Sequence, residues 1–157
     1  MDNQQLTPDA RPAPADPARV VAIARDWIGT PYRHQASTQG AGCDCLGLAR
    51  GVWRALRGAE PTELPPYTRD WGEAGAREVL ADAARRFLIE IPVGQARAGS
   101  LILFRMRPGA PAKHCGILIE TGSAPAFIHA YEHAGVVIHP YSEPWARRAR
   151  FAFLFPG

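Results

Sequence analysis

Cysteine and histidine side chains carry the nucleophilic chemistry that this sequence offers. Cys45 begins a stretch of helical periodicity directly after a glycine-rich loop, so it is expected in the first turn of a helix. Unpaired N–H groups and the positive end of the helix dipole stabilise a thiolate there, and the thiolate is the nucleophilic form of cysteine. We interpret Cys45 as a candidate nucleophile, although a buried structural thiol fits the spacing alone equally well. Cys43, in the preceding turn, is better explained as a small packed residue.

A cysteine nucleophile needs a base, which can lie far away in the sequence. A two-residue turn at Thr121-Gly122 would pair two strands so that His114 directly faces His129. His129 would then orient His114 beside Cys45, which is the arrangement of nucleophile, base and orienting group in a cysteine triad. Pro125 falls inside the second strand of this register and requires an edge position or a bulge there, and a longer loop would shift the register.

Metal binding is the other chemistry that these residue types allow. Cys43, Cys45, His114 and Cys115 are four soft ligands, but Cys-x-Cys followed by His-Cys lacks the usual spacing of a zinc site. The adjacent His114 and Cys115 would also point to opposite faces of a strand. We therefore expect no metal and no cofactor. Two further histidines are expected to be ordinary turn or sheet residues: His133 and His139.

The residue pattern predicts the elements that would position these groups. Apolar residues at helical spacing indicate three helices, one opening at Asp16-Pro17 and stopped by Gly29, and two over Cys45–Arg57 and Glu73–Arg86. The period then changes to two, which is typical of strands, over Ser100–Arg105, Cys115–Glu120, Ala126–Tyr131, Gly135–His139 and Arg150–Phe155. Helices followed by strands favour an α+β domain in which N-terminal helices pack on an antiparallel sheet.

Length and composition fit one domain with a short arm. The 157 residues suffice for one core, which we place at 17–157, and the polar, proline-rich residues 1–16 are expected to form a flexible arm. Three cysteines are too few for a disulfide scaffold. A net charge of +3 spread along the chain argues against nucleic acid as a partner. We find no signal peptide and no apolar run of about 18 residues, so we expect synthesis in the cytoplasm and no membrane span.

Five segments resemble, in order and spacing, the NlpC/P60 cell-wall peptidases. They are Gly29–Tyr32, Gly42–Leu48, Gly99–Leu101, His114–Ile117 and Phe127–Ala130. The Cys-Asp-Cys-Leu-Gly-Leu form of the second segment, together with Val137–Tyr141, is similar to the phage-type branch encoded in tail modules of siphophages and gene transfer agents. The resemblance covers about residues 18–157.

This resemblance implies a papain-like fold in which Cys45 is the nucleophile, His114 the general base and His129 the residue that orients the base. Tyr32 matches a tyrosine whose hydroxyl helps the Cys45 backbone N–H to hold the oxyanion. Asp44 matches a residue that contacts the amino end of the substrate. The family cleaves peptide stems of peptidoglycan, most often between γ-D-glutamate and a diamino acid.

Three positions depart from the family pattern without removing a catalytic group. Leu46 stands where many relatives have serine, and Cys115 replaces a common valine. Ser100 makes residues 99–101 Gly-Ser-Leu, where Gly-Asp-Leu is usual. The changes at Leu46 and Ser100 concern substrate contacts, so the mechanism is carried over more safely than the specificity.

The resemblance also implies a place of action. We expect an enzyme that is built into a phage-like tail, with tail-tip or baseplate proteins as partners, and carried to the peptidoglycan of the recipient's periplasmic wall. Two alternatives stay open. One is an amidase of the CHAP type, and the other is a structural tail adaptor or plug that keeps the peptidase fold with little activity.

Overall fold

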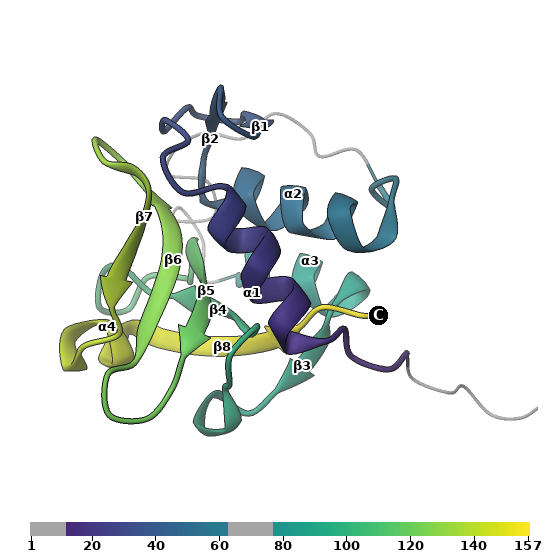
Figure 1. Ribbon diagram of the computed structural model, residues 1–157. Helices are drawn as coiled ribbons and strands as arrows, with labels where there is room; N and C mark the ends of the chain where they lie inside the picture. Colours follow the sequence, from purple (N-terminus) through teal and green to yellow (C-terminus); the bar gives the residue numbers. More distant parts are fainter. Residues whose placement is uncertain (1–11, 63–76) are drawn as a thin grey trace, which may run out of the picture.

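The computed structural model describes residues 12–62 and 77–157, which form helices packed on an antiparallel sheet (Figure 1). The helices are α1 (Pro17–Asp26), α2 (Cys45–Arg57), α3 (Val79–Phe87) and α4 (Glu143–Arg148), with a short 3₁₀ turn, η1 (Val93–Gln95). The strands are β1 (Ser37–Thr38), β2 (Gly42–Cys43), β3 (Ile89–Ile91), β4 (Leu101–Phe104), β5 (His114–Glu120), β6 (Ala126–Tyr131), β7 (Gly135–Pro140) and β8 (Ala149–Leu154). Six of them form one sheet in the order β3-β8-β4-β5-β6-β7, and each neighbouring pair is antiparallel. The predicted α+β class is confirmed.

The first two helices begin and end where the sequence predicts. The Asp16 side chain accepts a hydrogen bond from Ala18 N at the start of α1, and α2 occupies the predicted range. Gly29 follows α1 with φ +90° and Gly58 follows α2 with φ +84°. Glycine adopts such positive φ values without steric cost, so α2 stops at Gly58, and α1 ends at Asp26 in a turn that leads to Gly29.

The third helix does not run unbroken from the predicted start at Glu73, because Arg77 and Glu78 are not helical. Residues 73–76 lie outside the described part of the chain, and Glu78 precedes α3 in a non-helical conformation. Its carboxylate accepts a hydrogen bond from Ala112 N at 2.8 Å and pairs with Arg105 at 3.5 Å. These contacts hold Glu78 against the loop before β5, so α3 begins at the next residue, Val79.

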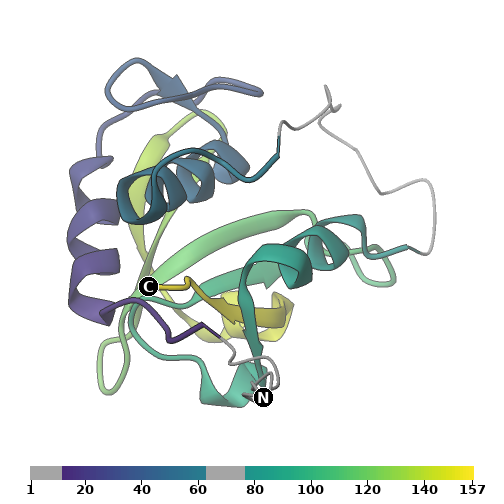
Figure 2. The ribbon, with the colours of Figure 1, turned by 90° about the vertical axis from the view of Figure 1, so that its right-hand side faces the viewer.

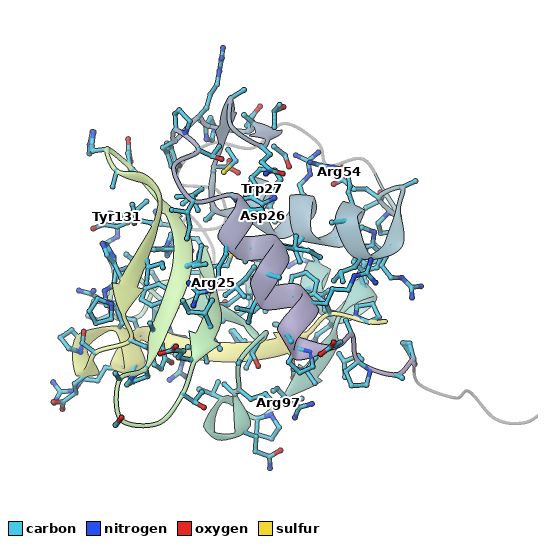
Figure 3. The ribbon with its side chains drawn as sticks, viewed as in Figure 1. Arg25, Asp26, Trp27, Arg54, Arg97 and Tyr131 are labelled. Carbon is cyan, nitrogen blue, oxygen red and sulfur yellow. The ribbon has the colours of Figure 1, made fainter. Side chains whose placement is uncertain are left out.

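The sheet has an apolar core on each of its faces. Helices α1, α2 and α3 cover one face over a large cluster that includes Val20, Leu48 and Ile128 (Figure 2). Trp27 packs against α2 at Gly51, where a Cβ would lie 2.0 Å from the indole ring, so only glycine permits this approach (Figure 3). The opposite face carries a second cluster, which contacts the unpredicted helix α4 through Trp145 and whose members include Phe104, Leu118 and Phe127.

The predicted register between β5 and β6 is wrong by two residues. The strands are joined by residues 121–125 instead of a two-residue turn, and Ile117 lies opposite Ile128. Pro125 therefore falls in the loop, where its carbonyl accepts a hydrogen bond from Tyr141 N. A shift of two residues keeps every side chain on its predicted face, because side chains alternate along a strand. His114 and His129 consequently share a face, as neighbours on a diagonal rather than as a directly opposed pair.

The end of the predicted N-terminal arm contacts the C-terminus. Pro14 forms an isolated bridge with Pro156, and Ala15 N donates a hydrogen bond to Phe155 O at 2.8 Å. Residues 1–11 of the predicted arm lie outside the described part of the chain. Across residues 12–62 and 77–157, no helix combines the length and the apolar composition that crossing a membrane requires.

Candidate active site

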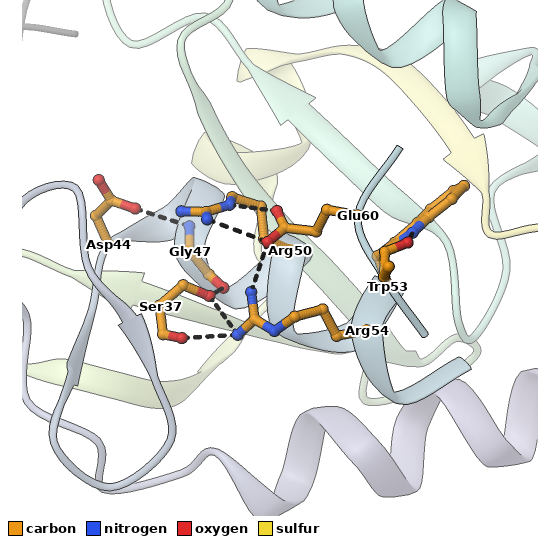
Figure 4. Close-up of polar contacts among 8 residues, drawn as sticks. Ser37, Asp44, Gly47, Arg50, Trp53, Arg54 and Glu60 are labelled. Carbon is orange, nitrogen blue, oxygen red and sulfur yellow. Dashed lines mark hydrogen bonds and ion pairs between the residues drawn. The ribbon is translucent and has the colours of Figure 1, made fainter. Parts of the chain in front are cut away.

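A buried aspartate organises the N-terminus of α2, where the candidate nucleophile lies. Asp44 is 2% exposed and is the N-cap of the helix. Its Oδ1 accepts a hydrogen bond from Gly47 N at 2.7 Å (Figure 4), and its Oδ2 accepts one from Gln35 N at 2.8 Å. The carboxylate thus joins the helix to the preceding loop, a role that its family resemblance did not suggest. Its contact with the amino end of a substrate stays a prediction.

Cys45 is the first residue of α2 and is half-buried. Its Sγ lies 3.9 Å from the carbonyl oxygen of Lys113, which directly precedes β5. The pKa of the Cys45 thiol is lowered well below its usual range, mainly by a hydrogen bond from the Cys115 thiol and further by His114, and these effects outweigh burial. The helix start adds backbone N–H groups that have no intrahelical acceptor. This environment favours the thiolate.

The three predicted triad residues come together. His114 opens β5, and His129 lies in β6 with no exposed surface. Nε2 of His114 lies 2.7 Å from Nδ1 of His129, so one of the two nitrogens donates a hydrogen bond to the other. His114 also contacts Cys45, whose pKa it lowers. The structure therefore places nucleophile, base and orienting group in the predicted order, and their catalytic roles stay predictions.

A glycine lies beside the two histidines, where there is no room for a side chain. A Cβ at Gly116, which lies two residues beyond His114 on the same face, would be 2.8 Å from a ring carbon of Phe127 and 3.1 Å from Cβ of His129. A side chain there would push at least one ring aside. The missing side chain of Gly116 thus leaves room for the Phe127 ring and for Cβ of His129 beside His114.

Aromatic rings enclose the histidines. The ring of His129 lies between Phe127, with centroids 4.4 Å apart, and Tyr131, which stacks on it at 5.1 Å. Trp145 from α4 makes an edge contact with His129 at 5.2 Å and lies 6.0 Å from the ring of His114. Helix α4 therefore completes the enclosure, and its presence was not predicted from the sequence.

A third histidine, His139, extends the pair, contrary to its expected role as an ordinary sheet residue. Its Nδ1 lies 2.8 Å from Nε2 of His129. The short turn between β6 and β7 places Tyr131 opposite Gly135 and His129 opposite Val137. His139, two residues further on, therefore shares a face with His129. The same counting of strand register that joined His114 to His129 could have found it.

The remaining candidate residues take different positions. Tyr32 forms a parallel bridge with Cys43 and lines an open hollow with the turn between β6 and β7. Its help in holding an oxyanion stays a prediction. Cys43 is fully buried, and burial raises its pKa to about 12, in agreement with a packed residue. His133 lies exposed in the turn.

Possible metal ligands do not gather in the described part of the chain. No group of three or more histidine, cysteine, aspartate or glutamate residues there has an arrangement that could hold a metal ion. None of the three cysteines, all of which lie in the described part of the chain, forms a disulfide. Cys115 is buried beside Cys45.

Comparison with solved structures identifies the fold. An NLP/P60 family protein from Staphylococcus aureus, described as similar to a lipoprotein, shares 23% identity at a TM-score of 0.61, over 95% of this chain and 45% of its own. An NlpC/P60 protein from Bacillus cereus shares 19% identity at a TM-score of 0.64, over 92% of this chain and 42% of its own. The chain thus spans less than half the length of these two relatives.

A third similar structure was solved with a reaction product. Ly7917 in complex with the hydrolysing product of MDP shares 15% identity at a TM-score of 0.61, over 90% of this chain and 64% of its own. At such identities the likeness establishes the fold. Among curated proteins, none matches this chain.

Family membership rests on the sequence. Residues 29–153 match the sequence model of the NlpC/P60 family, and this range contains Cys45, His114 and His129. The chain belongs to the NlpC/P60 family, whose members are cysteine peptidases that hydrolyse peptidoglycan.

Proposed function

We propose that this chain is a cysteine endopeptidase that cleaves the peptide stems of peptidoglycan, at the bond between γ-D-glutamate and a diamino acid. The observation that carries the proposal is the continuous contact from Cys45 at the start of α2, through His114, to His129. A buried orienting group, a base and a thiol with a lowered pKa are the parts that acyl transfer by a cysteine requires. The choice of bond follows from the family resemblance.

The proposed reaction has two steps. The Cys45 thiolate attacks the amide carbonyl carbon, and the protonated His114 gives its proton to the leaving amine, which leaves a thioester on Cys45. His114 then takes a proton from water, and the resulting hydroxide attacks the thioester and releases the acid. The N–H of Cys45, at the open end of α2, is positioned to stabilise the oxyanion in both steps. His129 accepts the Nε2 proton of His114 throughout.

The proposal includes delivery by a phage-like tail. Its support is the Cys-Asp-Cys-Leu-Gly-Leu form of residues 43–48 and the segment Val137–Tyr141, which resemble the phage-type branch of the family. On this proposal the chain is made in the cytoplasm, assembles with tail-tip or baseplate proteins, and acts on the periplasmic wall of the recipient. Proteomic analysis of purified particles from the producing cells tests this part, because a tail component must be present at a fixed ratio to the other tail proteins.

Mass spectrometry of the fragments released from diaminopimelate-type peptidoglycan tests the reaction. We expect cleavage after γ-D-glutamate by the purified protein and none by the Cys45→Ala variant. Cys43→Ala is the matched control, because it removes a buried thiol two residues away and should leave cleavage intact. A Cys45→Ala variant that still cleaves would remove Cys45 from the mechanism.

Other outcomes would identify the alternative functions. Cleavage at the lactyl–L-alanine bond would show an amidase of the CHAP type. If the folded protein released no fragment, and Cys45 reacted with iodoacetamide no faster than an ordinary thiol, the chain would be a structural tail adaptor. Both results would overturn the endopeptidase proposal.

A further inference from the structure

His139 extends the chain of contacts beyond the three triad residues. His114, His129 and His139 lie on β5, β6 and β7. Nε2 of His114 is 2.7 Å from Nδ1 of His129, and Nε2 of His129 is 2.8 Å from Nδ1 of His139. Each distance is that of a good hydrogen bond. The row of three imidazoles leads from the catalytic thiol to the edge strand of the sheet.

The central histidine is neutral. Burial, together with His114 and His139, lowers the pKa of His129 to about 2. A neutral imidazole has one N–H and one acceptor nitrogen. Since both ring nitrogens of His129 are in hydrogen bonds, one must donate and the other must accept. The row therefore has only two proton orders, one directed away from Cys45 and one directed toward it.

Only the order directed away from Cys45 suits a base. In that order Nε2 of His114 donates to Nδ1 of His129, and Nε2 of His129 donates to Nδ1 of His139. Nδ1 of His114 is then free to exchange a proton with Cys45, and protonated His114 keeps both hydrogen bonds. In the opposite order His129 presents an N–H to Nε2 of His114, where it would oppose the second N–H of the protonated ring.

We propose that His139 is a positioning residue that fixes the tautomer of His129, by accepting the proton of its Nε2 and so leaving its Nδ1 to accept from His114. The inference rests on the proposed cysteine peptidase mechanism and adds to it a residue that does not touch the substrate. Tautomer control is needed because a wrong tautomer in a triad removes most of the catalytic rate.

The surroundings of His129 leave His139 as the acceptor for its Nε2 proton. His129 has no exposed surface, so bulk water does not compete for this hydrogen bond. The other groups around the ring are aromatic: Phe127 and Tyr131 on β6 and Trp145 on α4. The guanidinium of Arg148 lies over the ring of Trp145, with Cζ 5.4 Å from the ring centroid. An N–H of His129 without His139 would be buried and unpaired, which is unfavourable.

Two nearly isosteric substitutions separate hydrogen bonding from packing. In His139→Asn the amide oxygen can occupy the place of Nδ1 and accept the same proton. In His139→Leu the shape is similar but no acceptor remains. His129 should then carry its proton on Nδ1, because that avoids a buried unpaired N–H. The hydrogen bond between His129 and His114 then runs in the opposite direction, from Nδ1 of His129 to Nε2 of His114.

Nitrogen-15 NMR of the histidine rings of the full chain gives the direct test. We expect the proton of His129 on Nε2 in the unaltered protein and in His139→Asn, and a substantial fraction on Nδ1 in His139→Leu. A proton on Nδ1 in the unaltered protein would overturn the proposal without any variant. So would a His129 tautomer that does not change in folded His139→Leu.

The pH profile of Cys45 alkylation by iodoacetamide is the second readout, with the label located by mass spectrometry. General acid–base assistance contributes roughly 10²–10⁴-fold to reactions of this kind, so we expect His139→Leu to lose about ten-fold or more at neutral pH. His139→Asn should recover most of this loss, which a purely structural role of the ring would not produce. Equal profiles for the two variants would contradict the inference.

Neither readout needs peptidoglycan, so the two proposals can fail separately. If the tautomer and the alkylation profile respond as expected while no fragment is released from peptidoglycan, the substrate proposal fails and the role of His139 stands. If peptidoglycan is cleaved equally well by the unaltered protein and by His139→Leu, the peptidase proposal stands and the role of His139 fails.

Discussion

The Cys115 thiol donates a hydrogen bond to the backbone carbonyl of Cys45, with Sγ and O 3.2 Å apart. It also provides the largest contribution to the lowered pKa of the Cys45 thiol. Cys115 follows His114 in β5 and is itself buried, so its side chain points to the helix face of the sheet while His114 points to the other face. A single strand thus supplies two groups that lower the pKa of Cys45.

Replacing Cys115 by valine should raise the pKa of Cys45, because the interaction with the Cys115 thiol is the largest cause of its lowering. The size of valine suits the buried position, so the fold should be kept. Thiolate absorbance of Cys45 measured across a pH titration would show the transition at higher pH than in the unaltered protein. Cys115→Ser is the matched control, since its hydroxyl can donate in place of the thiol. A transition unchanged by Cys115→Val would show that the thiolate is stabilised by His114 and the helix start alone.

Adding a methyl group at Gly116 should impair both catalysis and stability. The new Cβ would lie 2.8 Å from the Phe127 ring and 3.1 Å from Cβ of His129, so we expect Phe127 and the His129 ring that packs against it to shift. Overpacking of this kind costs about 1–3 kcal/mol. The rate of fragment release should fall by about ten-fold or more, because the base loses its aligned acceptor. Gly94→Ala is the control, since a Cβ there has no neighbour within 4 Å.

Replacing Asp44 should destabilise the chain through its two hydrogen bonds. Asp44→Ala leaves Gly47 N and Gln35 N without their acceptor in a buried site. Losing an N-cap costs about 0.5–2 kcal/mol, and the unpaired donors add to it. The Asp44→Asn side chain can still accept a hydrogen bond from Gly47 N. Its free energy of unfolding, measured in urea, should therefore fall by less than that of Asp44→Ala. Equal stability of Asp44→Ala and the unaltered protein would show that the cap does not hold the helix start.

The sequence was sufficient to predict the features that depend on local rules. The start of α2 at Cys45 follows from the N-cap preference of Asp44 and from the apolar stripe of the helix. The shared face of His114 and His129 follows from strand alternation, and it held although the predicted turn was too short. Such parity arguments tolerate an error of two residues, which explains why the contact between His114 and His129 was predicted from a wrong register.

The features that were missed depend on packing between distant elements. The contact of Cys115 with Cys45 requires α2 to lie against β5, which no local pattern specifies. Helix α4 is only six residues long and adds Trp145 to the histidine rings by tertiary contact. His139 was the exception, because counting back from the turn between β6 and β7 would have placed it beside His129.

An ion-pair network between α2 and the residues after it should make stability depend on pH. Glu60 accepts hydrogen bonds from Arg50 at 2.5 Å and from Arg54 at 3.1 Å, and Arg54 donates to Ser37 Oγ at 2.8 Å (Figure 4). Ser37 Oγ in turn donates to Gly47 O at 2.6 Å, so the network ties the loop before the nucleophile to α2.

The sign of the pH effect follows from the lowered pKa of Glu60. The hydrogen bond from Arg50 is its largest cause, and Arg54 adds to it, against a smaller effect of burial. A carboxylate whose folded pKa lies below the unfolded value of about 4.3 stabilises the fold above that value, and this is lost as the pH falls through the folded pKa. Glu60→Gln should therefore unfold more readily in urea at pH 7, by about 1 kcal/mol, since the carboxylate is only partly buried. The difference from the unaltered protein should disappear at acidic pH, and a difference that stays constant with pH would attribute the effect to packing rather than to charge.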